Sequence, residues 1–275
     1  MKKLFRSLMS GSDKKPKKAG KAGKPALPDG ARVYAVGDIH GRDDLFAALI
    51  EAIEDDIAAS DPAEVTVILL GDLVDRGPDS AGVIKRARKW QKRRNVRILF
   101  GNHEEMFVKS FTSKDTLRHF LRHGGKDTLL SYGIGKRELT QSSIAEAQAL
   151  MAEAVPQKDR DFLESFEDMV AMGDYLFVHA GIDPGVPLDE QDVRSLRWIR
   201  EPFLSHEESH GCMVVHGHTI TDGPDETKNR IGVDTGAYAS GRLTALVLEG
   251  TKRRYIVAAE KKKGGIKTEG AREAA

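Results

Sequence analysis

The sequence lacks several features that would assign the protein to a particular class. Among 275 residues there is one cysteine, Cys212, which excludes an internal disulfide and fits a reducing compartment. No apolar run approaches the roughly 18 residues of a membrane-spanning helix. The formal net charge is +1, so overall charge does not indicate a polyanion-binding protein. The apolar part of the N-terminus is too short and broken for a secretory signal, and we therefore expect a cytoplasmic location.

Both ends of the chain are polar. Residues 1–30 are rich in lysine, glycine, proline and alanine, a composition that buries too little apolar surface to order a chain. The first interpretation is a solvated basic tail without a binding role. The alternative is a tail that makes weak electrostatic contact with nucleic acid or an anionic surface. Residues 260–275 are expected to be a second polar, disordered tail. Residues 31–259 remain as one domain, and the chain's 40% hydrophobic content suffices for one large core.

Five short apolar runs in this domain each lead into glycine beside aspartate, asparagine or histidine. The run at residues 65–70 is continuous and β-branched, which is typical of a strand buried on both faces of a parallel sheet. In open α/β sheets, ligands bind at the edge where such strands end. The side chains delivered to that edge are those of Asp38, His40, Asp72, Asn102, His179 and His218.

Helical patterns at residues 43–57 and 80–94 separate the first three runs. These intervals suit alternating strands and crossover helices, which place the ends of the first three strands side by side. Residues 107–172 read as mostly helical, and we expect an insertion that covers the ligand edge and shapes substrate access. Later strands are expected at residues 175–178, 213–215, 230–233, 243–248 and 253–258, with antiparallel pairing among the last ones.

The six polar residues favour a catalytic metal centre. They offer oxygen and imidazole donors without a thiolate, a set that suits Mn²⁺, Fe or Zn²⁺. Six ligands are too many for one tetrahedral ion, and they make two adjacent sites if Asp72 bridges. Two divalent ions about 3.5–4 Å apart are the usual arrangement for in-line displacement at phosphorus. Taken singly, each motif is more often a hydrogen-bonded turn or a core histidine, and the ordered set is what favours metal.

Other polar residues near these motifs have plainer interpretations. His216 is expected to be a core residue or a neighbour of the ligands, because the glycine-histidine-threonine pattern selects His218. Asp234 fits a supporting carboxylate or a turn aspartate equally well. Tyr238 is a candidate for the wall of the substrate cleft, and Glu104 is expected to begin a helix.

Five motifs together resemble those of calcineurin-like metallophosphoesterases. The resemblance covers residues 31–248 and is closest to the phosphoprotein phosphatase branch, of the bacterial serine/threonine protein phosphatase type. It implies an α/β fold with a central β-sandwich flanked by helices. The motifs lie at residues 37–41, 71–77, 101–104, 179–181 and 217–219.

The resemblance also implies roles for matching residues. One ion would be held by Asp38, His40 and the bridging Asp72, and the other by Asp72, Asn102, His179 and His218. His103 would protonate the leaving oxygen, Asp75 would orient His103, and Arg76 would bind phosphate oxygens. For a second phosphate-binding arginine, we expect Arg200 rather than Arg197.

These roles predict a metallophosphoesterase with two divalent ions, manganese first among them, acting on a phosphorylated protein or a small phosphoester. We expect hydrolysis of phosphomonoesters, phosphoserine and phosphothreonine in particular, by attack of a metal-bridging hydroxide. One alternative is a symmetric dinucleoside tetraphosphate hydrolase, such as one acting on diadenosine tetraphosphate. Another is an inactive metal-binding scaffold with a basic tail, whose sign would be a missing acid, bridging aspartate or arginine.

Overall fold

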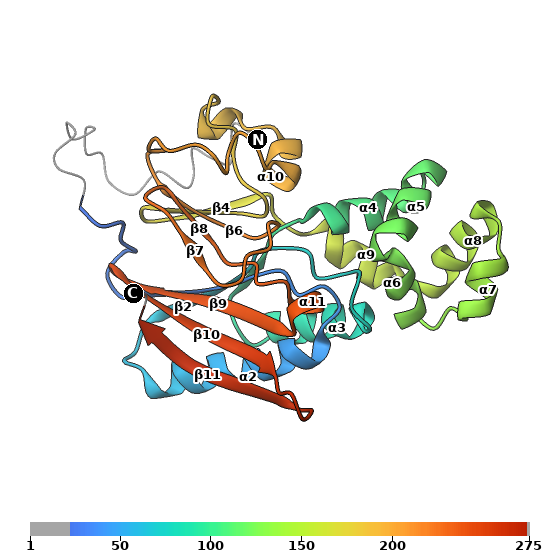
Figure 1. Cartoon of the computed structure of the whole chain (residues 1–275), viewed down its shortest axis with the longest axis horizontal. Coiled ribbons are helices and arrows are strands. Elements are labelled where there is room, and N and C mark those ends of the chain that lie inside the picture. Colours follow the sequence, from blue (N-terminus) through green and yellow to red (C-terminus); the bar gives the residue numbers. More distant parts are fainter. Residues whose placement is uncertain (1–22, 274–275) are drawn as a thin grey trace.

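Two β-sheets packed face to face form the centre of the structure (Figure 1). The structure is a computed structural model that describes residues 23–273. The first sheet, in the order β11-β10-β9-β1-β2-β3, consists of β1 (Ala31–Val36), β2 (Glu64–Leu69), β3 (Val96–Ile98), β9 (Arg242–Glu249), β10 (Lys252–Glu260) and β11 (Ile266–Glu273). The second, in the order β4-β5-β6-β8-β7, consists of β4 (Met169–Met172), β5 (Tyr175–Val178), β6 (Met213–His216), β7 (Asp225–Glu226) and β8 (Arg230–Gly232).

The strand directions bring several carboxyl ends together. β1, β2 and β3 are parallel, as the sequence predicts, while β9 and β10 join them antiparallel. In the second sheet, β5, β6 and β8 are parallel. The central β-sandwich flanked by helices, which the resemblance implies, is therefore present.

Side chains of β1 alternate between two cores. Val33 and Ala35 point between the sheets, where they join residues such as Phe177 of β5. Tyr34 and Val36 point to the other side, into the core under α2 (Asp43–Ala59) and α3 (Ser80–Gln91). A smaller third cluster lies between the outer face of β5 and β6 and the helix α10 (Val193–Trp198). β1 is thus buried on both faces, and β2 is buried in the same way, with Val67 and Leu69 in one core and Ile68 in the other, which explains the apolar run at residues 65–70.

A block of helices projects from one side of the sandwich (Figure 1). It consists of α4 (Asn102–Ser110), α5 (Lys114–Phe120), the π-helical turn η1 (Leu121–Gly125), α6 (Lys126–Ser131), α7 (Lys136–Gln141), α8 (Ile144–Ala154) and α9 (Gln157–Glu164). The predicted insertion is therefore helical only as far as Glu164. Its last residues form β4, which pairs antiparallel with β5 because the turn at Gly173 (φ 57°) reverses the chain between them. Within residues 23–273, no helix has the length and apolar character needed to cross a membrane.

Both predicted tails contain ordered residues. Leu27 is buried, and its N–H donates to the Gly250 carbonyl at 2.9 Å, so the folded part begins before residue 31. Residues 1–22, where most of the predicted basic tail and its suggested anionic contacts fall, lie outside the described residues. The expectation of disorder over residues 260–275 is wrong for Ile266–Glu273, which form β11 along the edge of β10. Backbone pairing holds this polar segment, and Ile266 packs against the core under α2.

Candidate metal centre and active site

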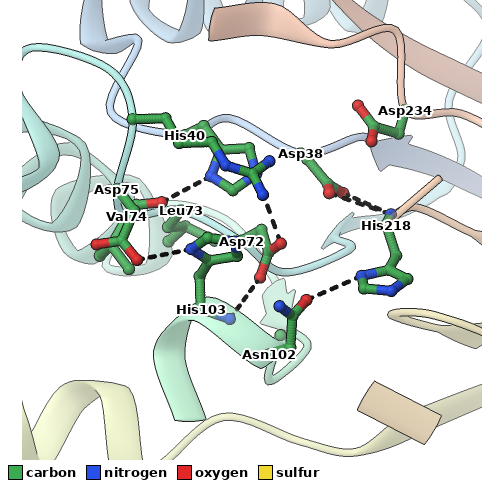
Figure 2. A network of polar contacts seen from close by, with 12 residues as sticks. Asp38, His40, Asp72, Leu73, Val74, Asp75, Asn102, His103, His218 and Asp234 are labelled. Carbon is green, nitrogen blue, oxygen red and sulfur yellow. Dashed lines mark hydrogen bonds and ion pairs between the residues drawn. The ribbon is translucent and has the colours of Figure 1, made fainter. Parts of the chain in front are cut away.

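The predicted ligands lie in the segments that directly follow β1, β2, β3, β5 and β6, and they come together there. Figure 2 shows Asp38, His40, Asp72, Asn102 and His218 around one centre. All six are buried, with exposed fractions of 7% or less. Asp72 lies at their centre, with Oδ1 3.4 Å from His179 Nε2 and Oδ2 3.5 Å from His40 Nε2. Its two oxygens therefore face two separate imidazoles, as a bridging carboxylate requires.

One group of ligand atoms lies on the Oδ1 side of Asp72. Atoms of Asp72, His179 and His218 come within 4.8 Å of one another. The Asn102 side-chain oxygen joins them, 3.0 Å from His179 Nε2 and 2.8 Å from His218 Nδ1. These four residues are the set that the resemblance implies for the second ion.

A second group lies on the Oδ2 side and differs in part from the expectation. Atoms of His40, Asp72 and His103 come within 4.8 Å of one another, so His103 stands in this group in place of the expected Asp38. The Asp38 carboxylate accepts the backbone N–H of His218, at 3.1 and 3.2 Å to its two oxygens. This contact joins Asp38, in the loop after β1, to the loop after β6 that carries His218.

The hydrogen bonds of the imidazoles prepare them to bind cations. His40 Nδ1 lies 2.7 Å from the Val74 carbonyl, and His179 Nδ1 lies 2.8 Å from the Leu70 carbonyl. Each Nδ1 must donate to its carbonyl, so in the neutral ring each Nε2 carries a lone pair. The His179 lone pair faces oxygens of Asp72 and Asn102, and a cation between these acceptors would stabilise them. The His40 lone pair faces both an Asp72 oxygen and the Arg76 guanidinium. The residues therefore fit divalent ions.

Burial favours the neutral form of His40 and His218. It lowers the pKa of His40 to about 3 and lowers the pKa of His218 as well, so both rings are unprotonated near neutral pH. Burial together with the neighbouring carboxylates of Asp234 and Asp72 raises the pKa of Asp38. Carboxylates gathered in this way also favour a bound cation, which offsets their mutual repulsion.

The backbone of the site is unusual. Among the described residues, the non-glycine residues with positive φ are His40 (44°), Asp72 (48°), Asp75 (73°), Arg76 (69°) and His218 (62°). This left-handed conformation is rarely adopted outside glycine, because Cβ crowds the following carbonyl. All five are predicted site residues, and strain of this kind is characteristic of functional sites that the surrounding structure holds in place.

Glu104 is the main support of the loop that carries Asp72. Its buried carboxylate accepts four backbone N–H groups, two at each oxygen, from Asp72, Leu73, Val74 and Gly101 at 2.7–3.2 Å. The sequence predicts the start of α4 at this glutamate. The contact with residues 72–74 was not predicted, because no local pattern links segments so far apart in sequence.

The predicted acid and its orienting carboxylate are in contact. His103 Nδ1 lies 2.6 Å from Asp75 Oδ2, and both side chains are buried. Burial lowers the pKa of His103 to about 4, against the opposing effect of the Asp72 carboxylate, and burial raises the pKa of Asp75. The second Asp75 oxygen accepts a hydrogen bond from the Thr128 hydroxyl at 2.6 Å, a partner that the sequence did not indicate.

The three candidate arginines lie in different places. Arg76 Nη1 is 2.9 Å from His40 Nε2, and its guanidinium lies 4.8 Å from the centre of the Tyr238 ring. Arg200 is exposed beside the group on the Oδ1 side of Asp72, with Nη2 3.4 Å from the His218 carbonyl. Arg197 points elsewhere, since it pairs with Asp168 at 2.7 Å and stacks on Phe100.

Three further residues can now be placed. Tyr238 contacts His40 edge to face at 5.4 Å and is 36% exposed, so it borders the site as expected. Asp234 is buried near Asp38, which fits a carboxylate that supports the ligands. It also accepts the Gly236 N–H at 2.8 Å, as a turn aspartate does. His216 is a buried residue against Phe203, with Nδ1 3.0 Å from the Gly217 carbonyl.

A groove runs along α4 beside the site. One cavity of about 350 Å³ is lined by residues of α4 and α5 together with Trp198, and another of about 540 Å³ is lined by residues of α4 and α10. Both are bordered by Glu105, Lys109 and Trp198, so they adjoin each other. Glu105 and Lys109 lie on the helix that begins with Asn102 and His103, so α4 carries both the candidate acid and one wall of the groove.

Comparisons with known proteins agree with this geometry. A sequence model described as calcineurin-like phosphoesterase matches residues 31–241. A serine/threonine-protein phosphatase 1 of Salmonella typhimurium is 27% identical over 77% of this chain and 89% of that protein. A symmetrical bis(5′-nucleosyl)-tetraphosphatase of an Acidovorax species is 35% identical over 106 residues, which are 36% of this chain and only 35% of that protein. The crystal structure of a putative diadenosine tetraphosphatase superposes with a TM-score of 0.58 at 21% identity, covering 87% of this chain and 93% of that one, and shows the same fold.

Proposed function

The chain belongs to the calcineurin-like phosphoesterase family, and from that premise we propose that it hydrolyses phosphomonoesters, specifically phosphoserine and phosphothreonine in proteins. The observation that carries the proposal is the position of His103. Its ring lies within 4.8 Å of ligand atoms of His40 and Asp72 and is held by Asp75 at 2.6 Å. A proton donor therefore stands directly beside a candidate metal group.

We assign two divalent ions to the site. Asp38, His40 and Asp72 would hold one, and Asp72, Asn102, His179 and His218 the other; the oxygen and imidazole donors suit manganese, iron or zinc. When bound, such ions neutralise phosphate charge and lower the pKa of water, which supplies a nucleophile near neutral pH. Asp72 contributes to both sites because its two oxygens point to different imidazoles.

The chain's own side chains complete the reaction. Arg76 binds the phosphoryl oxygens through its planar guanidinium, and Arg200 approaches them from the side of His218. As the bond between phosphorus and the ester oxygen breaks, His103 gives the proton on Nε2 to that oxygen. The second proton stays on Nδ1, which donates it to Asp75 Oδ2, and this hydrogen bond keeps Nε2 turned toward the leaving group.

Two observations support a phosphoprotein as the substrate. The relative printed as a serine/threonine-protein phosphatase aligns over 89% of its own length. The groove bordered by Glu105, Lys109 and Trp198 lies along α4, the helix that also carries His103, and we assign it to the peptide that flanks the phosphorylated residue. A substrate that carries nucleosides would instead call for a compact, enclosed pocket around the base.

The first test measures phosphate release from p-nitrophenyl phosphate and from phosphoserine and phosphothreonine peptides, with Mn²⁺ added. We expect metal-dependent turnover of all three, and a loss of about 10²-fold or more on the peptides in His103→Asn. Equal peptide turnover by the wild type and His103→Asn would overturn the assignment of the acid. No turnover of any phosphomonoester by the folded, metal-supplied protein would overturn the proposed function.

A second candidate is symmetric hydrolysis of dinucleoside tetraphosphates, which the 35% identity to a symmetrical tetraphosphatase favours. Chromatography of products from diadenosine tetraphosphate separates the two proposals. Release of two ADP molecules with a kcat/KM well above that for phosphopeptides would favour this second candidate. The scaffold alternative gains no support, because Asp72, Asp75, Arg76 and His103 lie together in the site.

A further inference from the structure

A hydroxyl group on helix α6 contacts the carboxylate that orients the candidate acid. Thr128 lies on α6 and is fully buried, and its Oγ1 donates to Asp75 Oδ1 at 2.6 Å. The other oxygen of the same carboxylate is 2.6 Å from His103 Nδ1. The three side chains form a continuous series, Thr128–Asp75–His103, whose first member is separated from Asp75 by 53 positions in the sequence.

The direction of each hydrogen bond follows from the atoms available. A carboxylate only accepts, so the single hydroxyl proton of Thr128 goes to Asp75. Ser80 Oγ lies 2.9 Å from Thr128 Oγ1, and because the Thr128 proton is already used, Ser80 must be the donor to Thr128. The backbone N–H of Asp75 donates to both hydroxyl oxygens, at 3.0 Å to Ser80 and 2.9 Å to Thr128. Ser80 begins α3, so two helices hold the backbone and the carboxylate of Asp75 together.

We propose that Thr128 is a positioning residue for proton transfer by His103. This inference rests on the proposed function. Asp75 has a left-handed backbone (φ 73°) at the edge of a strained loop, and one of its oxygens already binds His103. The Thr128 hydroxyl fixes the other oxygen, which sets the plane of the carboxylate and, through it, the orientation of the imidazole. A catalytic hydrogen bond needs this second support, because small errors in ring position weaken transfer to the leaving oxygen.

A neighbouring contact shows that the same helical block also holds the next residue of the loop. The N–H of Arg76 donates to the Gly124 carbonyl at 3.2 Å. Gly124 has φ of 105°, and a Cβ there would lie 2.6 Å from the Arg76 side chain, so the turn packs closely against the arginine. Residues 124–128 therefore contact both the phosphate-binding arginine and the orienting carboxylate. The insertion is part of the site's framework as well as a border of the groove.

The test uses the dependence of rate on the leaving group. p-Nitrophenolate departs without a proton, whereas the alkoxide of a serine phosphate requires one. In Thr128→Val, which keeps the shape and removes the hydroxyl, we expect kcat on a phosphoserine peptide to fall by about 10-fold or more and kcat on p-nitrophenyl phosphate to change by less than about 3-fold. Thr128→Ser, which retains the hydroxyl, should restore the peptide rate to within about 3-fold of the wild type.

Two controls separate positioning from general damage. Thr66 is also buried, with Oγ1 3.0 Å from Asn95 Nδ2, but lies on β2 away from the site, and Thr66→Val should leave the ratio of the two rates unchanged. In the His103→Asn background, Thr128→Val should have no further effect on the peptide rate, because the group that it orients is gone. Should Thr128→Val fail to fold, Ser80→Ala, which removes the donor to Thr128, should show the same selective loss to a smaller degree.

The outcomes are distinct. An equal loss on both substrates, or an equal loss with and without His103, would overturn the proposal and make Thr128 a purely structural residue. An unchanged peptide rate in folded Thr128→Val would overturn it as well. If the wild type itself hydrolyses neither phosphomonoester, the failure belongs to the proposed function instead.

Discussion

The backbone N–H of Asp72 donates to Glu104 Oε2 at 2.8 Å, so the residue at the centre of the metal site is held by a carboxylate from the start of α4. The same carboxylate accepts N–H groups of the next two residues and of Gly101. One side chain thus joins the loop after β2 to the loop after β3. This junction fixes the relative positions of Asp72 and Asn102, which contribute to the same candidate site.

Replacing Glu104 with glutamine should be costly despite the similar shape. The amide has one acceptor oxygen, and its NH₂ group would face backbone N–H donors, leaving two of them unsatisfied in a buried position. Hydrogen bonds to a charged group contribute about 1.5–3 kcal/mol each, so we expect a loss of about 3 kcal/mol or more. Thermal unfolding should show a Tm lower by about 6–12 °C. Glu105→Gln in the next, half-buried position is the matched control, and an equal shift in both variants would contradict the role of Glu104.

Much of the fold and of the candidate ligand set was predictable from the sequence, because both depend on local patterns. Buried strands give apolar runs, and each run ended in a glycine with a polar neighbour. Those polar residues do come together, as the contacts of Asp72 with His40 and His179 confirm. The roles of individual residues in catalysis stay predictions.

What the sequence could not predict depends on contacts between distant segments. Thr128 and Glu104 have no local signature, since a threonine or a glutamate in a helix is common. The left-handed backbone of Asp75 and Arg76 is set by the surrounding contacts rather than by their residue types. β11 was missed for a similar reason: its residues are polar, and pairing with β10 rather than an apolar pattern orders them.

Removing divalent metal should lower both activity and stability. Lone pairs and carboxylates gathered around Asp72 repel one another, and a bound cation would offset this repulsion. At a metal concentration of 100 times Kd, binding stabilises the folded protein by about 2.7 kcal/mol. We expect a Tm that is about 5–10 °C higher in Mn²⁺ than in EDTA, measured by differential scanning fluorimetry. Asp72→Asn should abolish most of this difference, whereas Asp159→Asn, which breaks an ion pair with Arg88 elsewhere, should retain it.

The second phosphate-binding arginine can be identified by comparing two variants. Arg200 is exposed, and its hydrogen bond is to the His218 carbonyl rather than to a carboxylate. Arg200→Ala should therefore leave Tm within about 1 °C. The same variant should reduce kcat/KM on phosphopeptides by about 10-fold or more, because a phosphate-binding guanidinium is lost. Arg197 pairs with Asp168 and stacks on Phe100, so Arg197→Ala should mainly lower Tm. Steady-state kinetics together with thermal unfolding separates the two effects. The reverse pattern would move the role from Arg200 to Arg197.

Truncation after Glu260 tests whether β11 contributes to the fold. The deletion removes a strand that pairs with β10 from Glu260 to Arg254 and packs against α2 through Ile266. It exposes the edge of β10, and we expect a loss of about 2 kcal/mol, seen as a Tm lower by about 4–8 °C, together with a greater tendency to aggregate. Metal-dependent turnover of p-nitrophenyl phosphate should persist at temperatures well below Tm, because β11 lies at the opposite edge of the sheet from β2 and β3, whose loops carry the site. An unchanged Tm would mean that these residues behave in solution as the disordered tail that their composition predicts. A truncation that leaves Tm unchanged but abolishes turnover would instead place β11 in contact with the site.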